Sequence, residues 1–223
     1  MSKGDMGWIV EEKSSSVQSL HSLSAKDWNS PRVWIMSPTD RCVVLGSSQS
    51  DQYIDYSYAE REEIGVARRN TGGGAVWVDQ EALLWVDLFL PRHHHLWIDD
   101  IHVSANWIGG VWRHALGKLG IDCQLHNGSL ERSPIADLIC FAGRGPGELL
   151  VGNQKVLGIS QRRTREGTRF QCALTLEWDP KHLINLFNRA PIKNMESLIR
   201  DSGTNIRFES SKVVDVFLQA LDL

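Results

Sequence analysis

Hydrophobic positions recur along the chain at two spacings, which separate predicted helices from predicted strands. The clearest helical spacing covers residues 101–119, where the apolar side chains keep to one face. Asp99 or Asp100 can cap the start of this helix, and Gly120 follows where a left-handed residue commonly ends one. The Gly109-Gly110 pair inside it indicates close packing against a sheet. Shorter helices are predicted at residues 14–24 and 55–64, after Asp179-Pro180, and twice within 195–223.

Short apolar runs between turn residues predict the strands. They cover residues 33–36, 42–45, 75–78, 83–90, 148–151, 155–163 and 168–178, and a turn at 37–40 joins the first two. Only three residues separate 148–151 from 155–163, so these two runs are expected to form a hairpin. Strands and helices follow no regular alternation. The predicted fold class is therefore α+β, with a mixed or antiparallel central sheet and helices packed on it.

Composition and charge narrow the class of protein. The chain has 223 residues, of which 42% are hydrophobic and 23% charged, as in ordinary globular proteins. A formal net charge of -3 indicates neither a nucleic acid nor a membrane as partner. The start of the chain is polar and carries no secretory pattern, and no apolar run reaches the length of a membrane span, so a cytoplasmic location is expected.

Cysteine and histidine residues offer little sign of a metal site. The four cysteines, at positions 42, 123, 140 and 172, are far apart and form no CxxC pair, so reduced thiols are expected rather than structural zinc. The run His93-His94-His95 follows a predicted strand and is expected to be a polar loop rather than a metal site.

The first candidate for chemistry is a glycine-rich stretch at residues 68–76, which reads RRNTGGGAV. Three consecutive glycines cost backbone entropy and help only where the backbone takes positive φ or approaches a ligand closely. Successive N–H groups in such a loop can bind an anion, and Arg69 beside them offers a planar fork for phosphate or carboxylate. The alternative is a flexible loop flanked by solvated arginines.

The second candidate is the stretch at residues 152–160, which reads GNQKVLGIS. Lys155 opens a strand of otherwise apolar or small residues, so its ammonium must reach water or meet an anion. Gly158 and Ser160 leave room for a ligand on one face of that strand. The alternative is a surface lysine at the corner of a hairpin.

Together the two stretches resemble the lipoate–protein ligase and octanoyltransferase family, which shares its catalytic domain with biotin–protein ligases. The resemblance covers roughly residues 38–180, and the order of elements agrees with it. It implies a catalytic domain over residues 1–190, with 191–223 as a short helical extension of the same domain. No GRGRxGR motif is present, so biotin ligase is the weaker relative.

The resemblance implies an enzyme that activates lipoate or octanoate with ATP, accompanied by Mg2+, and transfers the acyl group to a lysine of a lipoyl domain. That domain would belong to the E2 subunit of a 2-oxoacid dehydrogenase or to the glycine-cleavage H protein. Lys155 would lie between the acyl carboxylate and the α-phosphate, where one ammonium stabilises charge on both. The residues implied to contact substrate or ATP are Arg69, Thr71, Gly72, Gly73, Gly74, Ala75, Val76, Trp77, Gly158 and Ser160. Trp77 would also suit an apolar slot for the acyl chain.

Two alternatives remain open within the resemblance. Some octanoyltransferases of this family use no ATP and carry a Cys-Phe pair near the place of Cys140-Phe141, where a thiolate takes octanoyl from acyl-carrier protein. A buried structural cysteine is the other interpretation of Cys140. A non-catalytic homologue that only binds an acyl or adenylate ligand is the second alternative, because Cys172-Ala173 replaces the usual His-Gly pair and Val78 a usual histidine. The accessory domain of long ligases is largely missing, so adenylation would need a partner protein.

Overall fold

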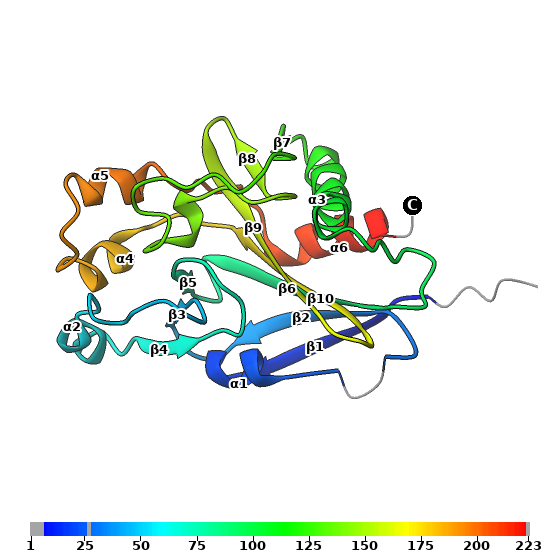
Figure 1. Ribbon diagram of the computed structural model, residues 1–223, viewed down its shortest axis with the longest axis horizontal. Helices are drawn as coiled ribbons and strands as arrows, with labels where there is room; N and C mark the ends of the chain where they lie inside the picture. Colours follow the sequence, from blue (N-terminus) through cyan, green and yellow to red (C-terminus); the bar gives the residue numbers. More distant parts are fainter. Residues whose placement is uncertain (1–6, 26–27, 222–223) are drawn as a thin grey trace, which may run out of the picture.

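The computed structural model describes residues 7–25 and 28–221, and these form two sheets with helices around them (Figure 1). The large sheet has the strand order β1 (Ile9–Ser15), β2 (Arg32–Pro38), β6 (Leu83–Pro91), β10 (Gly167–Thr175), β9 (Gln154–Arg163), β8 (Leu149–Val151) and β7 (Gln124–Leu125). The small sheet has the order β4 (Gly65–Arg68), β3 (Cys42–Leu45) and β5 (Val76–Val78). Both sheets mix parallel and antiparallel pairs, which confirms the predicted α+β class.

The helices lie around the two sheets. They are α1 (Val17–Ser22), α2 (Tyr56–Arg61), α3 (Ile101–Lys118), α4 (Lys181–Leu186), α5 (Met195–Arg200) and α6 (Ser210–Leu221), with a 3₁₀ turn at Cys140–Ala142. Helices α3 and α6 pack together on one face of the large sheet, where the rings of Trp112 and Phe217 stack at 4.0 Å (Figure 1). None of the helices in residues 7–25 and 28–221 has both the length and the hydropathy to cross a membrane.

Alternation along the strands explains how the two sheets face each other. On β6, Leu84 and Val86 pack toward α3 and α6, whereas Trp85 packs toward α1 and the small sheet. On β3, Val44 faces the large sheet, and Val43 faces the core formed with α2, α4 and α5. Strand β6 is therefore buried on both faces, which accounts for its nearly continuous apolar sequence.

Most predicted elements are present, with differences at turns. The runs 33–36 and 42–45 are strands but lie in different sheets, since β2 pairs with β1 and β6 while β3 pairs with β4 and β5. Helix α2 ends at Arg61 rather than near residue 64, because Glu63 takes the left-handed conformation at φ 55° and Gly65 already belongs to β4. Strand β10 ends at Thr175 and does not reach residue 178.

The glycine pair of α3 packs differently from the prediction. A Cβ on Gly109 would lie 2.0 Å from the carbonyl oxygen of Gly147, so the helix touches a loop there and not a sheet. Gly147 itself has φ +83°, a conformation that favours glycine. Gly110 has no neighbouring atom within 4 Å and is not explained by packing. The contact fixes α3 against the loop that leads into β8.

Candidate active site

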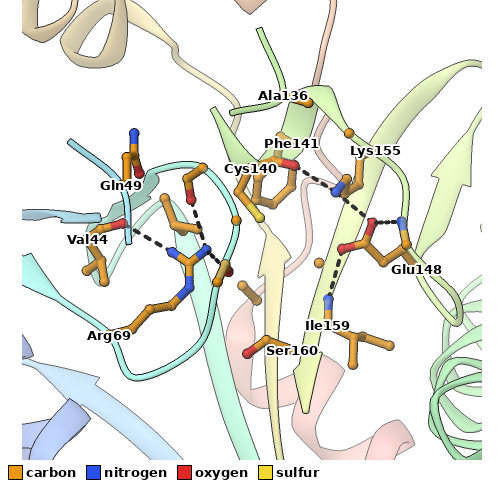
Figure 2. Close-up of a pocket in the computed structure, with 18 of the residues that line it drawn as sticks. Val44, Gln49, Arg69, Ala136, Cys140, Phe141, Glu148, Lys155, Ile159 and Ser160 are labelled. Atoms are coloured by element: carbon orange, nitrogen blue, oxygen red, sulfur yellow. Dashed lines mark hydrogen bonds and ion pairs between the residues drawn. The ribbon is translucent and has the colours of Figure 1, made fainter. Parts of the chain in front are cut away.

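A cavity of about 930 Å³ opens between the two sheets. Its inner walls come from the facing sides of the sheets, with Val44, Val76 and Val78 on one and Trp85 and Ala173 on the other. The glycine-rich stretch, the 3₁₀ turn and the start of β9 border the same cavity, and Figure 2 shows Arg69, Cys140 and Lys155 of these segments around it. The predicted site residues that line it are Arg69, Gly72, Gly73, Gly74, Val76, Cys140, Lys155, Gly158 and Ser160. Two stretches more than 75 residues apart in sequence therefore meet at one cavity.

The glycines at 72–74, here called the glycine loop, serve both the fold and the cavity. Gly73 has φ +98°, and a Cβ on Gly74 would lie 2.7 Å from the backbone of Ile139, so the chain itself requires both. Gly72 has open space where a Cβ would stand. Within the described part of the chain, the N–H groups of all three glycines donate no hydrogen bond. Free N–H groups on a cavity wall are suited to bind an anionic oxygen.

Arg69 is buried beneath the glycine loop, with 6% of its surface exposed. Its guanidinium donates to the carbonyl oxygens of Val44 at 3.2 Å, Gly72 at 2.8 Å and Gly74 at 2.9 Å, and to Thr71 Oγ1 at 3.1 Å (Figure 2). Four of its five N–H donors are therefore used by the chain. Arg69 shapes the loop, and the fork predicted for a phosphate is occupied by backbone carbonyls.

Backbone hydrogen bonds join the glycine loop to the 3₁₀ turn. The N–H of Ala75 donates to the carbonyl of Leu138 at 2.8 Å, and the N–H of Cys140 donates to the carbonyl of Ala75 at 2.9 Å. Ala75 is completely buried and does not line the cavity, so its part is to hold these two segments together. Cys140 is thereby fixed beside the loop.

Lys155 forms a buried ion pair. Only 2% of the residue is exposed, which excludes a surface lysine at the hairpin corner. Its Nζ donates to Glu148 Oε2 at 2.7 Å and to the carbonyl oxygen of Cys140 at 2.8 Å (Figure 2). A buried ammonium requires such partners, because removal from water is costly without them. The carbonyl contact places the charge against the residue that bears the thiol.

Glu148 is a functional candidate that the sequence pattern did not single out. Its Oε2 also accepts from the N–H of Gly145 at 2.6 Å, and its Oε1 accepts from the N–H of Ile159 at 3.2 Å. The ladder between β8 and β9 is irregular at Leu149/Leu150, next to Glu148, and the carboxylate binds the N–H of Ile159 beyond the point where β9 pairs with β8. The sequence does hold one clue to Glu148: a lysine in an apolar strand needs an acidic partner, and Glu148 lies just across the hairpin.

Cys140 is the accessible thiol of the four. The residue is half-buried, and Figure 2 shows its sulfur pointing into the space between the glycine loop and β9. Burial raises the pKa of Cys42 to about 12 and that of Cys123 to about 11, and it also raises the pKa of Cys172, which borders the cavity without exposed surface. These three thiols stay protonated, whereas Cys140 is open to a ligand.

The remaining predicted residues take different places. Thr71 Oγ1 lies 3.3 Å from Ser160 Oγ, which links the glycine loop to β9. Trp77 does not line the cavity, because Val76 and Val78 occupy the inner face of β5 and the indole stacks on His182 at 4.8 Å on the outer face. The expectation of an acyl slot against Trp77 is therefore wrong.

The histidine run at residues 93–95, predicted to be a loop, lies in the loop between β6 and α3. The ring of His94 is largely buried and lies 4.3 Å from that of His95 and 6.2 Å from that of Trp8. Residues 7–25 and 28–221 contain no group of three or more His, Cys, Asp or Glu side chains placed to hold a metal ion.

His21 lines the cavity from α1 and was not predicted. It is 9% exposed, and its ring centroid lies 4.4 Å from that of Trp85. Burial, followed by the nearby charges of Arg169 and Arg69, lowers the pKa of His21 to about 3, so the imidazole is neutral near pH 7. No motif marks this residue, because its place depends on the packing of α1 between distant strands.

Solved structures show the same fold at low sequence identity. A lipoate-protein ligase A bound with ATP superposes with a TM-score of 0.72 at 19% identity, covering 97% of this chain and 83% of that one. A bipartite lipoate protein ligase from Thermoplasma acidophilum, described with its E2 lipoyl domain, gives 0.71 at 18% identity, covering 97% and 82%. A biotin protein ligase from Aquifex aeolicus gives 0.52 at 12% identity, covering 97% and 68%.

Sequence comparison adds a relative and a family. An octanoyl-[GcvH]:protein N-octanoyltransferase from Oceanobacillus iheyensis is 28% identical over 191 residues, which cover 82% of this chain and 62% of that protein's length. The family model for the lipoyl protein ligase A/B catalytic domain matches residues 16–220, nearly all of the chain. The match takes in the glycine loop, Cys140, Glu148 and Lys155, and the chain therefore belongs to the family of lipoyl protein ligase A/B catalytic domains.

Proposed function

We propose that this protein transfers a lipoyl or octanoyl group to a lysine of a lipoyl domain, with Cys140 as the nucleophile. One observation carries the proposal: the thiol of Cys140 opens into the cavity while the carbonyl of the same residue accepts a hydrogen bond from Lys155 at 2.8 Å. The acceptor class is supported by relatives whose names include GcvH and an E2 lipoyl domain. These activities are proposals for this chain, which spans 62% of the transferase relative.

The first step would load the acyl group onto the enzyme. The thiolate of Cys140 attacks the carbonyl carbon of a donor thioester, such as octanoyl-acyl-carrier protein. The new carbon–sulfur bond forms, the bond to the donor's sulfur breaks, and the donor leaves as a thiol with the proton that the Cys140 thiol gave up. Lys155 holds a cation on the carbonyl of the same residue, from which it can stabilise the negative charge that develops during the transfer.

The oxygen of the reacting carbonyl becomes negatively charged in each step. The N–H groups of Gly72, Gly73 and Gly74 donate to no group of the described chain and border the cavity near Cys140. They are suited to hold this oxyanion, and Arg69 keeps the loop in shape while it does so.

The second step would deliver the acyl group. The amine of the acceptor lysine attacks the thioester carbon, the carbon–nitrogen bond forms and the carbon–sulfur bond breaks. The sulfur of Cys140 leaves as a thiolate and takes the proton released by the nitrogen, so the enzyme returns to its starting form. No ATP is consumed on this route.

ATP-dependent ligation is the second candidate, and the size of the cavity favours it. A volume of about 930 Å³ exceeds the needs of an eight-carbon chain and suits an acyl-adenylate. Lys155 would then lie between the carboxylate and the α-phosphate, and Mg2+ would accompany ATP. Arg69 weighs against this route, because the chain already uses four of its five donors and leaves one for a phosphate.

An acceptor assay separates the two routes. A lipoyl domain is incubated with the protein and octanoyl-acyl-carrier protein without ATP, and in parallel with lipoate, ATP and Mg2+, and its mass is measured. The proposal expects modification in the first mixture and its loss with Cys140→Ser. Modification only in the second mixture, unchanged by Cys140→Ser, would establish the ligase. No modification in either mixture would leave a binding homologue without turnover.

A further inference from the structure

The far wall of the cavity contains a buried polar side chain with no partner. His21 is 91% buried and lines the cavity, yet its ring nitrogens make no hydrogen bond within residues 7–25 and 28–221. Its one close ring contact is with Trp85, at 4.4 Å. The ring nitrogens are not among the fully enclosed polar atoms of the described residues, so they keep contact with the cavity and can bond to a group that enters it.

A row of paired residues crosses the large sheet from the end of the cavity near Cys140 to the end near His21. Gly158 on β9 lies opposite Ala173 on β10, and Ala173 lies opposite Trp85 on β6. Neighbouring strands are ~4.8 Å apart, so about 10 Å separate Gly158 from Trp85 along this row. Glycine and alanine leave an open trough, and the indole with the imidazole of His21 closes it.

The opposite wall of the trough is apolar. Val44, Val76 and Val78 come from the inner face of the small sheet and border the same cavity. An aliphatic chain attached at Cys140 would therefore run between valine side chains and the Gly158–Ala173 row. Its distal end would meet His21 and Trp85.

The chemistry of His21 and Trp85 determines which acyl chain fits this end of the cavity best. A hydrocarbon methyl group would leave the imidazole N–H and ring nitrogen unsatisfied. A sulfur atom is polarisable, accepts a weak hydrogen bond and packs favourably against an aromatic ring such as Trp85. The neutral state of His21 suits an uncharged partner.

We infer that His21 is a specificity-determining residue that recognises the distal end of the acyl chain and favours the dithiolane of a lipoyl group over the methyl end of an octanoyl group. The inference rests on the proposed function, since it assumes that the acyl chain occupies this cavity. It goes further by naming which of the two acyl groups the site prefers and which residue makes the distinction.

Calorimetric titration of the free acids tests the inference without catalysis. The full chain carrying Cys140→Ser, which prevents thiol–disulfide exchange with the dithiolane, is titrated with R-lipoate and with octanoate in the absence of ATP. The same titrations follow with His21→Leu, which keeps the bulk and removes the polarity, and with His21→Gln, which keeps a polar group. Gln18→Ala, on an exposed position of α1, is the matched control.

The expected result is a preference for lipoate that His21→Leu lowers about tenfold, mainly through weaker lipoate binding. His21→Gln is expected to keep most of the preference, and Gln18→Ala all of it. An unchanged lipoate-to-octanoate ratio in His21→Leu, with both acids still bound, would overturn this inference and leave the proposed function standing. Binding of neither acid to any variant would overturn the acyl site itself.

Discussion

Arg69 and Lys155 are two buried cations on the walls of one cavity, and they differ in what holds them. Arg69 donates to three backbone carbonyls and a hydroxyl that belong to, or lie beside, the glycine loop. Lys155 is held by a carboxylate, Glu148, and by the carbonyl of the residue that carries the accessible thiol. Both satisfy the requirement that a buried charge be paired. Both residues are buried, so burial does not distinguish them. Their hydrogen-bond partners do: Arg69 holds the backbone of a loop, whereas Lys155 is held beside the thiol.

The largest expected effect comes from Lys155→Ala. It removes the charge beside Cys140, and we expect acyl transfer to fall about 10²–10³-fold, as when one electrostatic stabiliser is lost. It also leaves Glu148 buried without its cation, which costs about 3–5 kcal/mol of stability. Single-turnover acylation and urea unfolding measure the two effects.

A double variant separates these two consequences of the lysine. Lys155→Met with Glu148→Gln removes both charges, so much of the stability should return while the activity stays low. Recovery of activity in the double variant would show that Lys155 acts only as a partner of Glu148. Lys155 would then be a structural cation like Arg69.

Arg69→Ala is expected to act on stability first. The carbonyls of Val44 and Gly74 lose their donor, and we expect a loss of about 2–4 kcal/mol in the free energy of unfolding. Amide hydrogen exchange at residues 71–75 should become faster, which checks that the glycine loop has loosened. Arg69→Lys keeps the charge but not the fork. Full stability in both variants, with weaker binding of a substrate anion, would mean that Arg69 is a ligand-binding group after all.

Glu148→Gln should have an intermediate effect. The amide keeps the size of the side chain but weakens the contacts with Lys155 and the N–H of Gly145, so we expect a stability loss of about 1.5–3 kcal/mol. Acyl transfer should fall about tenfold, because the ammonium loses the group that positions it. The matched control is Glu131→Gln, on an exposed acid near the same cavity, for which no such change is expected.

His21 extends the comparison to a buried group that has no partner and stays neutral. Its pKa is lowered to about 3 in the folded protein, against about 6.5 in the unfolded chain. Below pH 6.5 the unfolded chain binds a proton that the folded protein refuses, so the stability present above pH 6.5 is lost as the pH falls. Between pH 7 and pH 4.5 the wild type should lose about 2.5 kcal/mol more than His21→Leu. Parallel losses in both proteins would show that His21 is protonated in the fold.

The elements of the fold follow from local patterns to a large extent. The spacing of apolar residues identifies α3, and the left-handed residue predicted after it is Gly120, at φ +78°. The three residues between β8 and β9 identify their hairpin. Patterns of this kind do not say which sheet a strand joins, and so the separation of β2 from β3 could not be predicted.

Only the part of the site that lies in the two sequence motifs could be predicted. The glycine loop and Lys155 are recognisable because each carries a local cost that only a special role explains. The pairing of Lys155 with Glu148 depends on an irregular ladder, and the outward direction of Trp77 depends on which face of β5 meets the large sheet. His21 reaches the cavity because α1 packs between strands that are distant in sequence. These features arise from tertiary packing, which no single segment specifies.

Acylation of Cys140 can be detected in the intact mass of the protein. The full chain is incubated with octanoyl-acyl-carrier protein without ATP, quenched in acid and weighed, alongside Cys140→Ser and a control at a buried thiol, Cys123→Ser. We expect one added octanoyl group on the wild type and on Cys123→Ser, removable by hydroxylamine, and none on Cys140→Ser. An unmodified wild-type protein that still modifies a lipoyl domain with lipoate and ATP would contradict the role of Cys140 as nucleophile.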